Sequence, residues 1–358
     1  MNPAVGTAAA LAGRGHDIAW AGPADLVRRM AGPDAHPGVR AAIEEFGPDV
    51  VIADQQTVAG GLIAESLGLT WVTSATTSAE LVDPLAGMPK VAAWLDGLLD
   101  ALRGRIAGGR GTADPRMSPH GVLVYTTRAL LGPIELPDHV WLVGPSLTGR
   151  PAASDFPWQW LEGAEHVVLL VSLGTADADA SAPFLNAAVQ GLSGKADVRA
   201  VAVDTAGRVT GTASNILLRP HVPQLSLLSR VDAVVCHAGH NTVCEALWHG
   251  VPPVVAPIRD DQPIVAGQVT DAGAGVRLRF GRADARRIAD AVDTVLDEAS
   301  GHREAARAVG RSFRAAGGSR AAADRLESLL PHVAPGRHGR NRVGADPAGR
   351  SGHHPKPA

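Results

Sequence analysis

The amino-acid sequence predicts an α/β protein with two domains built on parallel sheets. Strand-like apolar runs alternate along the chain with amphipathic helical stretches, which is the pattern of parallel sheets covered by helices. Residues 144–156 interrupt this alternation with a Pro-, Gly- and Ser-rich segment that is typical of an interdomain linker. A chain of 358 residues, of which 45% are hydrophobic, is long enough to form two cores.

The expected elements of the first half follow one another as short apolar runs and helical stretches. We expect helices at 8–13, 39–46, 59–67 and 91–106, and strands at 17–20, 49–53, 70–73 and 122–125. The second half restarts with the apolar run 166–172, followed by a helix at 182–192. We therefore expect an N-terminal domain at 1–147, a linker at 148–164 and a C-terminal domain at 165–331. Residues 332–358 offer almost nothing to bury and are predicted to be a disordered tail, in which His353 and His354 are a compositional accident and not metal ligands.

Composition excludes several classes of protein. The formal net charge of −3 offers no bulk attraction for nucleic acid or for an anionic membrane. The two cysteines, Cys236 and Cys244, are interpreted as reduced, small apolar residues. No charged-then-apolar leader opens the chain and no apolar run is long enough to span a membrane. We expect a cytoplasmic protein.

The segment after the apolar run 233–236 has the features of an anion site. The run is interpreted as a strand that ends in the small-residue turn 237–239, and a helix is expected to begin near Asn241 and Thr242, both good N-cap residues. Gly239 lets a phosphate approach the backbone, and His237 can donate a hydrogen bond toward it. Glu245 follows about one helical turn later, where a carboxylate can accept from both ribose hydroxyls.

Together with residues 219–224 and 259–262, this segment resembles the inverting family 1 glycosyltransferases of the GT-B fold, in particular their actinobacterial macrolide and natural-product branch. The resemblance covers roughly residues 1–330 and implies two Rossmann-like parallel-sheet domains that face a central cleft. It also implies a UDP- or TDP-sugar as cosubstrate, no further cofactor, and no metal. His221, with the adjacent Val222, would flank the base, and Gln224 would reach the base or ribose. The pyrophosphate would be held by His237, Gly239, Asn241 and Thr242, the ribose by Glu245, and the sugar hydroxyls by Asp261 and Gln262.

Two further groups have alternative interpretations. Ser172 and Thr175 lie in a Gly turn after the first strand of the second half; a plain turn is the simple interpretation, but the family places such a turn over the donor phosphates. Asp177 and Asp179 could in principle hold a divalent cation. We expect instead a solvated loop that caps the following helix, and likewise a helix cap at Asp260.

Catalysis of this kind needs a base for the acceptor hydroxyl, and a neutral His oriented by a carboxylate suits that task. Asp54 ends a buried-type strand, at the edge where open α/β sheets bind ligands. In the family this Asp orients the catalytic His; it could also cap a helix starting near Thr57. The family pattern places the His directly before Met1, so we expect the true start upstream, after a strand-forming run. His16 follows the helix, away from the ligand edge, and is interpreted as structural.

The acceptor is left open. The stretch between Trp20 and Asp49 is short for the family, so that either the acceptor pocket is open on that side or the gene carries a deletion. The implied acceptor is a small apolar natural product, and Asp261 with Gln262 favours a UDP-hexose over a deoxysugar donor. A donor-binding protein without activity and a GT-B nucleotide-sugar epimerase are the alternatives.

Overall fold

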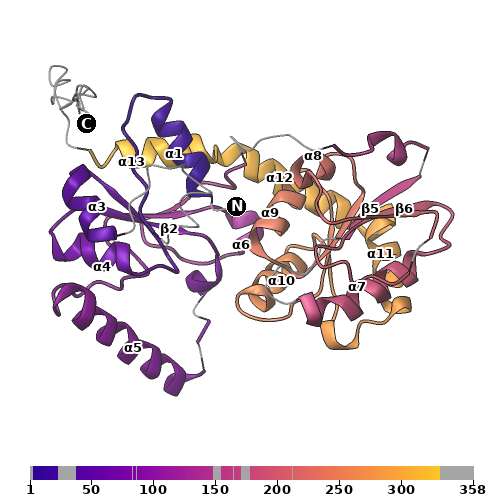
Figure 1. The fold of residues 1–358 in the computed structure, drawn as a ribbon, viewed down its shortest axis with the longest axis horizontal. Coiled ribbons are helices and arrows are strands. Elements are labelled where there is room, and N and C mark those ends of the chain that lie inside the picture. The colour runs from indigo at the N-terminus through magenta and orange to yellow at the C-terminus, as the bar shows by residue number, and fades with distance from the viewer. Residues whose placement is uncertain are drawn as a thin grey trace, which may run out of the picture.

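The computed structural model describes residues 3–22, 38–82, 84–85, 87–147, 155–163, 165–170, 178–211 and 213–330. Two parallel sheets organise this part of the chain, a four-stranded sheet from the first half and a six-stranded sheet from the second (Figure 1). The predicted α/β class with two parallel sheets is confirmed, whereas the predicted domain boundaries stay predictions. Among the described helices, none is both long and apolar enough to cross a membrane.

The first sheet has the strand order β1-β2-β3-β4, and all its pairs are parallel. Its strands are β1 (Val51–Asp54), β2 (Trp71–Ala75), β3 (Val122–Val124) and β4 (Val140–Leu142). Its helices are α1 (Ala4–Ala12), α3 (Val39–Phe46), α4 (Ala59–Ser66), α5 (Pro89–Ala107) and α6 (Arg128–Leu131), with the 3-10 turn η1 (Ala79–Val82). The strands are apolar runs because helices cover both faces of the sheet.

The second sheet has the order β10-β9-β8-β5-β6-β7, so that the strand order reverses between β5 and β8. Its strands are β5 (His166–Leu170), β6 (Val198–Val203), β7 (Ile216–Arg219), β8 (Ala233–Cys236), β9 (Pro253–Val255) and β10 (Val276–Arg277). The helices in this half of the chain are α7 (Ala178–Leu192), α8 (Gln224–Leu228), α9 (His240–Trp248), α10 (Gln262–Asp271), α11 (Ala285–Leu296), α12 (His302–Ala316) and α13 (Ser319–Glu327). In such sheets ligands bind at the carboxyl ends of the strands beside this reversal.

The two faces of the second sheet have separate cores. Leu169 and Val234 pack under α9 and α12, and Val168 and Val235 pack under α7 and α11. The last described helix packs against the first sheet, unlike the two helices directly before it in the sequence. Helix α13 returns to the first sheet, where Leu326 joins a core with residues of α1, β2 and β3 (Figure 1).

Most expected elements are present, with shifted ends. Helix α3 has the predicted bounds, whereas α1 begins at Ala4 and α7 at Ala178, each earlier than predicted. The strand predicted at 17–20 is wrong, because these residues form no ladder. They line the same pocket as β1 and pair with no described strand. The predicted tail, with His353 and His354, lies outside the described residues.

Candidate functional site

The turn between β8 and α9 is strained and compact. Ala238 has a φ of 66°, in the left-handed region that an alanine rarely adopts. Helix α9 begins at His240, near the predicted start, but its N-cap is Gly239 and not Asn241 or Thr242. Both residues instead lie in the first turn of the helix, because the helix begins one residue before Asn241. Strain of this kind is concentrated at binding sites, since the surrounding structure must hold it in place.

His237 and Gly239 are in close contact. A Cβ atom at Gly239 would lie 2.6 Å from Nε2 of His237, so only glycine leaves the imidazole in this position. His237 is half-buried, and its Nδ1 atom has no hydrogen-bond partner among the described residues. Burial lowers the pKa of His237, and the charge of Asp261 opposes that shift. A neutral imidazole therefore stands beside the positive end of α9, where anions bind.

A hydrogen bond joins two segments of the predicted site. Nε2 of Gln224, the first residue of α8, donates to Oε2 of Glu245 in α9 over 2.7 Å. Glu245 is only 3% exposed. His221 is exposed on the loop that leads into α8, and the next residue, Val222, packs against the core under α9. The structure thus brings Gln224 and Glu245 together, with His221 at the rim of the same region.

Asp261 and Gln262 lie where α10 begins. Oε1 of Gln262 accepts hydrogen bonds from the backbone N–H groups of Ile258 and Arg259 at 2.8 and 3.2 Å, which fixes the preceding loop. The N-cap is Asp261, so the prediction that Asp260 caps this helix is wrong. Asp260 adopts a φ of 55° and pairs with Arg259 at 3.4 Å.

The loop after β5 can be located only in part. Ser172, Thr175 and Asp177 lie outside the described residues. Helix α7 begins at Ala178, so Asp179 belongs to the helix and not to the predicted loop. Within the residues that the structure describes, no group of His, Cys, Asp and Glu could hold a metal ion.

The cysteines and the second histidine of the turn are buried. Cys236 and Cys244 are free, as expected, and burial raises the pKa of Cys236 to about 11 and that of Cys244 further still, which keeps both thiols neutral. Nε2 of His240 lies 3.5 Å from Sγ of Cys244. Burial lowers the pKa of His240, partly offset by Asp261 and by a hydrogen bond involving the backbone of Tyr125 in the first half of the chain. His240 was not singled out from the sequence.

Asp54 lies at the carboxyl end of β1, at the edge expected for ligands. Its Oδ1 accepts from the N–H of Gln56 over 2.9 Å. Helix α4 begins later, at Ala59 with Val58 as N-cap, so the alternative that Asp54 caps a helix is wrong: the carboxylate stabilises the turn after the strand. His16 binds Glu327 of α13 through Nε2 at 3.0 Å, in agreement with its structural interpretation.

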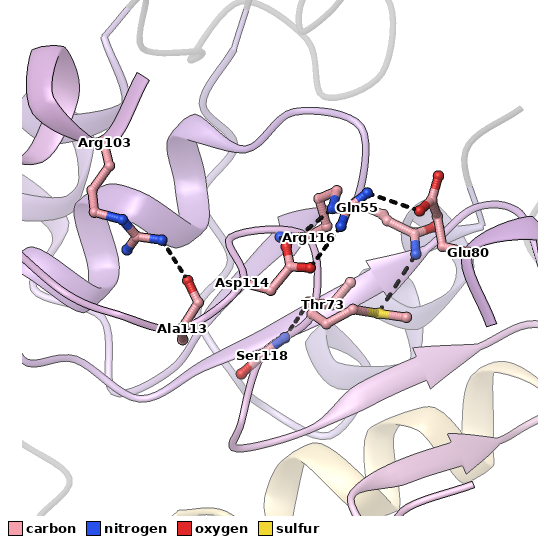
Figure 2. A network of polar contacts seen from close by, with 9 residues as sticks. Gln55, Thr73, Glu80, Arg103, Ala113, Asp114, Arg116 and Ser118 are labelled. Atoms are coloured by element: carbon pink, nitrogen blue, oxygen red, sulfur yellow. Dashed lines mark hydrogen bonds and ion pairs between the residues drawn. The ribbon is translucent and has the colours of Figure 1, made fainter. Parts of the chain in front are cut away.

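A polar network supports the residue after Asp54 (Figure 2). Nε2 of Gln55 lies 3.7 Å from Sδ of Met117. Arg116, which precedes Met117 in the chain, forms ion pairs with Asp114 at 2.9 Å and with Glu80 at 3.0 Å. A separate bond links the two halves of the chain. Oγ of Ser78 donates to Oε1 of Gln268 in α10 over 2.8 Å. The bonds of Gln55 with Met117, of Arg116 with Glu80 and of Ser78 with Gln268 have no local sequence signal, because the partners are far apart in the chain.

Comparison with known proteins identifies what this arrangement is similar to. Residues 191–329 match the family model described as the C-terminal domain of erythromycin biosynthesis protein CIII-like proteins. The chain is 30% identical over 293 residues to 4′-demethylrebeccamycin synthase of Lentzea aerocolonigenes, which covers 72% of this chain and 68% of that protein. It is 32% identical over 187 residues to an uncharacterised UDP-glucosyltransferase of Bacillus subtilis, covering 51% of this chain and 45% of that protein. The chain therefore spans about half the length of some curated relatives that it matches.

Solved structures agree with the fold. The glycosyltransferase of kitacinnamycin superposes with a TM-score of 0.72 at 26% identity, over 92% of this chain and 95% of the other. Two more distant structures show the same fold. One is VinC solved with dTDP (21% identity, TM-score 0.63, 86% of this chain and 78% of the other) and one is a spinosyn rhamnosyltransferase solved with its aglycone (21%, 0.69, 91% and 96%).

Proposed function

The chain belongs to the GT-B glycosyltransferases of natural-product pathways, and we propose that it transfers a hexose from a UDP-sugar to a hydroxyl of a small apolar natural product. One observation carries the proposal: the Gln224–Glu245 hydrogen bond joins the first residue of α8 to the middle of α9. Helix α9 follows β8, the strand at which the order of the second sheet reverses, and sheets of this kind bind ligands beyond the carboxyl ends of the strands at that point.

The proposed donor site follows from the chemistry of these side chains. The first turn of α9, with His237, Asn241 and Thr242, would bind the pyrophosphate, and its dipole would stabilise the charge that develops on the leaving nucleotide. This arrangement needs no metal ion. The buried Glu245 would bind the ribose, and His221 with Gln224 would contact the base. Because Oε1 of Gln262 is engaged by the backbone, its amide nitrogen is the group that would donate to a sugar hydroxyl.

The proposed reaction inverts the anomeric carbon. The acceptor oxygen forms a bond to that carbon while the bond to the nucleotide phosphate breaks, and a base takes the acceptor proton. Asp54 would orient the histidine base expected directly before Met1. Asp261 and Gln262 favour a glucose-like donor, since a deoxysugar leaves such polar groups unpaired. The dTDP and the aglycone in the two distant structures agree with a nucleotide and an apolar acceptor as ligands.

Calorimetry on the full chain tests the donor site. UDP or dTDP should bind with measurable heat, and His237→Ala should weaken binding by roughly ten- to a hundredfold, because a hydrogen bond to a charged group is lost. A folded protein that gives no heat with either nucleotide contradicts the assignment. Binding without transfer from UDP-glucose to any apolar acceptor would instead support the alternative of a donor-binding protein.

A further inference from the structure

One hydrogen bond ties helix α10, where the proposed sugar contacts begin, to the first half of the chain. Oγ of Ser78 donates to Oε1 of Gln268 over 2.8 Å. Ser78 is fully buried directly before the 3-10 turn η1, and Gln268 is only 7% exposed. A hydrogen bond that is shielded from water in this way is stronger than one at the surface, so it fixes one segment against the other.

The segment around Ser78 is itself attached to the first sheet (Figure 2). Glu80 in η1 pairs with Arg116 at 3.0 Å. The loop that carries Arg116 is joined in turn to β2, because the N–H of Ser118 donates to Oγ1 of Thr73 over 2.9 Å. Ser78 therefore lies in a segment that these contacts hold against the first sheet.

The other end of the bond lies within α10, which begins at Gln262 with Asp261 as its N-cap. Gln268 lies six positions after Gln262, which is about 9 Å along the helix axis. Val265 and Val269 anchor the same helix in the core of the second sheet. Because a helix of this length moves as one body, a bond at Gln268 also orients the N-terminus of α10.

Gln268 is a poor residue for stability alone. Its Nε2 is buried and has no hydrogen-bond partner among the described residues. A buried donor without a partner costs free energy, which offsets the gain from the bond at Oε1. An apolar side chain of similar length would avoid that cost. The glutamine therefore indicates a need for the directed contact with Ser78.

We propose that Ser78 and Gln268 are positioning residues, whose hydrogen bond holds the N-terminus of α10 in the orientation that binds the donor sugar. The inference rests on the proposed function, in which Asp261 and Gln262 contact the sugar hydroxyls. The nucleotide would bind at α8 and α9, and this bond involves neither helix. Loss of the bond should therefore weaken the contacts to the sugar and spare those to the nucleotide.

Calorimetry of the full chain with UDP-glucose and with UDP separates these two sets of contacts. Ser78→Ala should weaken UDP-glucose binding by about three- to tenfold, as expected when hydrogen bonds to the sugar are lost. The affinity of this variant for UDP should stay within about twofold of the original.

Ser312→Ala is the matched control. Oγ of Ser312 in α12 donates to Oγ1 of Thr127 over the same distance of 2.8 Å, and this bond also joins the two halves of the chain. It does not involve α10, so its loss should alter neither affinity.

A double variant separates positioning from a general loss of stability. Ser78→Ala combined with Gln268→Met removes both partners of the bond, so that no group is left unpaired and the urea midpoint should not fall. UDP-glucose binding should nevertheless be as weak as in Ser78→Ala.

Three outcomes would overturn the inference: unchanged UDP-glucose binding in Ser78→Ala, an equal loss of UDP binding in that variant, or the same effect from Ser312→Ala. A folded, unaltered chain that binds neither nucleotide, or UDP without UDP-glucose, would instead overturn the proposed function, and the inference with it.

Discussion

An added methyl group at Gly239 would lie 2.6 Å from Nε2 of His237, closer than any real Cβ contact. The backbone of Gly239, with φ −61° and ψ 130°, is open to any residue, so alanine there is not strained in itself. We therefore expect Gly239→Ala to displace the His237 ring. Calorimetry should show nucleotide affinity reduced by roughly tenfold or more, with little loss of stability.

Gly267 in α10 provides the matched control for this residue. A Cβ atom there would meet no other atom within 4 Å. Because alanine is the better helix former, Gly267→Ala should raise the free energy of unfolding by about 0.5–1 kcal/mol and leave nucleotide affinity as it is. If both variants bind nucleotide equally well, His237 is not a phosphate ligand.

At the scale of the element, the first residue of α9, His240, makes the stability of the folded protein depend on pH. Burial lowers the pKa of His240 from 6.5 in the folded protein, so the unfolded chain takes up the proton first. The contribution of His240 to the free energy of unfolding is fully present above about pH 6.5, the pKa in the unfolded chain. It is lost as the pH falls through the lower pKa of the folded protein. Urea unfolding between about pH 7.5 and 5.5 should show this decline. His240→Gln should flatten this decline in part, because burial also lowers the pKa values of His237 and His249.

The elements also show how far sequence reasoning reaches. Helix α3 and strand β3 were predictable because each carries its burial pattern locally, an amphipathic repeat in one and a continuous apolar run in the other. Residues 17–20 were mispredicted because a strand requires a partner, and none of the described strands pairs with them. In the site, Gln224 and Glu245 were each singled out from the motif. Their mutual hydrogen bond and the left-handed Ala238 depend on how β8 and α9 meet, which no local pattern records.

For the whole molecule, the decisive contact is between the two ends of the described chain. Arg14, after α1, binds Asp324 and Glu327 of α13 at 2.8 and 2.7 Å, and His16 also binds Glu327. The hydrogen bond from His16, helped by Arg14, lowers the pKa of Glu327. Below these ion pairs Leu326 packs with Leu11 and Leu123. The first sheet therefore depends on a helix that follows the second sheet in sequence.

Leu326→Ala tests that dependence. Leu326 is 4% exposed, and truncation of a buried leucine costs about 2–5 kcal/mol because it removes apolar contacts and leaves a cavity. If α13 stabilises the first sheet locally, hydrogen exchange of the Leu123 amide in β3 should accelerate far more than that of Val234 in β8. Ser328→Ala, at an exposed position just beyond α13, is the control and should change neither amide. Equal acceleration of both amides would contradict a local effect. It would mean that the two sheets unfold as one cooperative unit that includes α13.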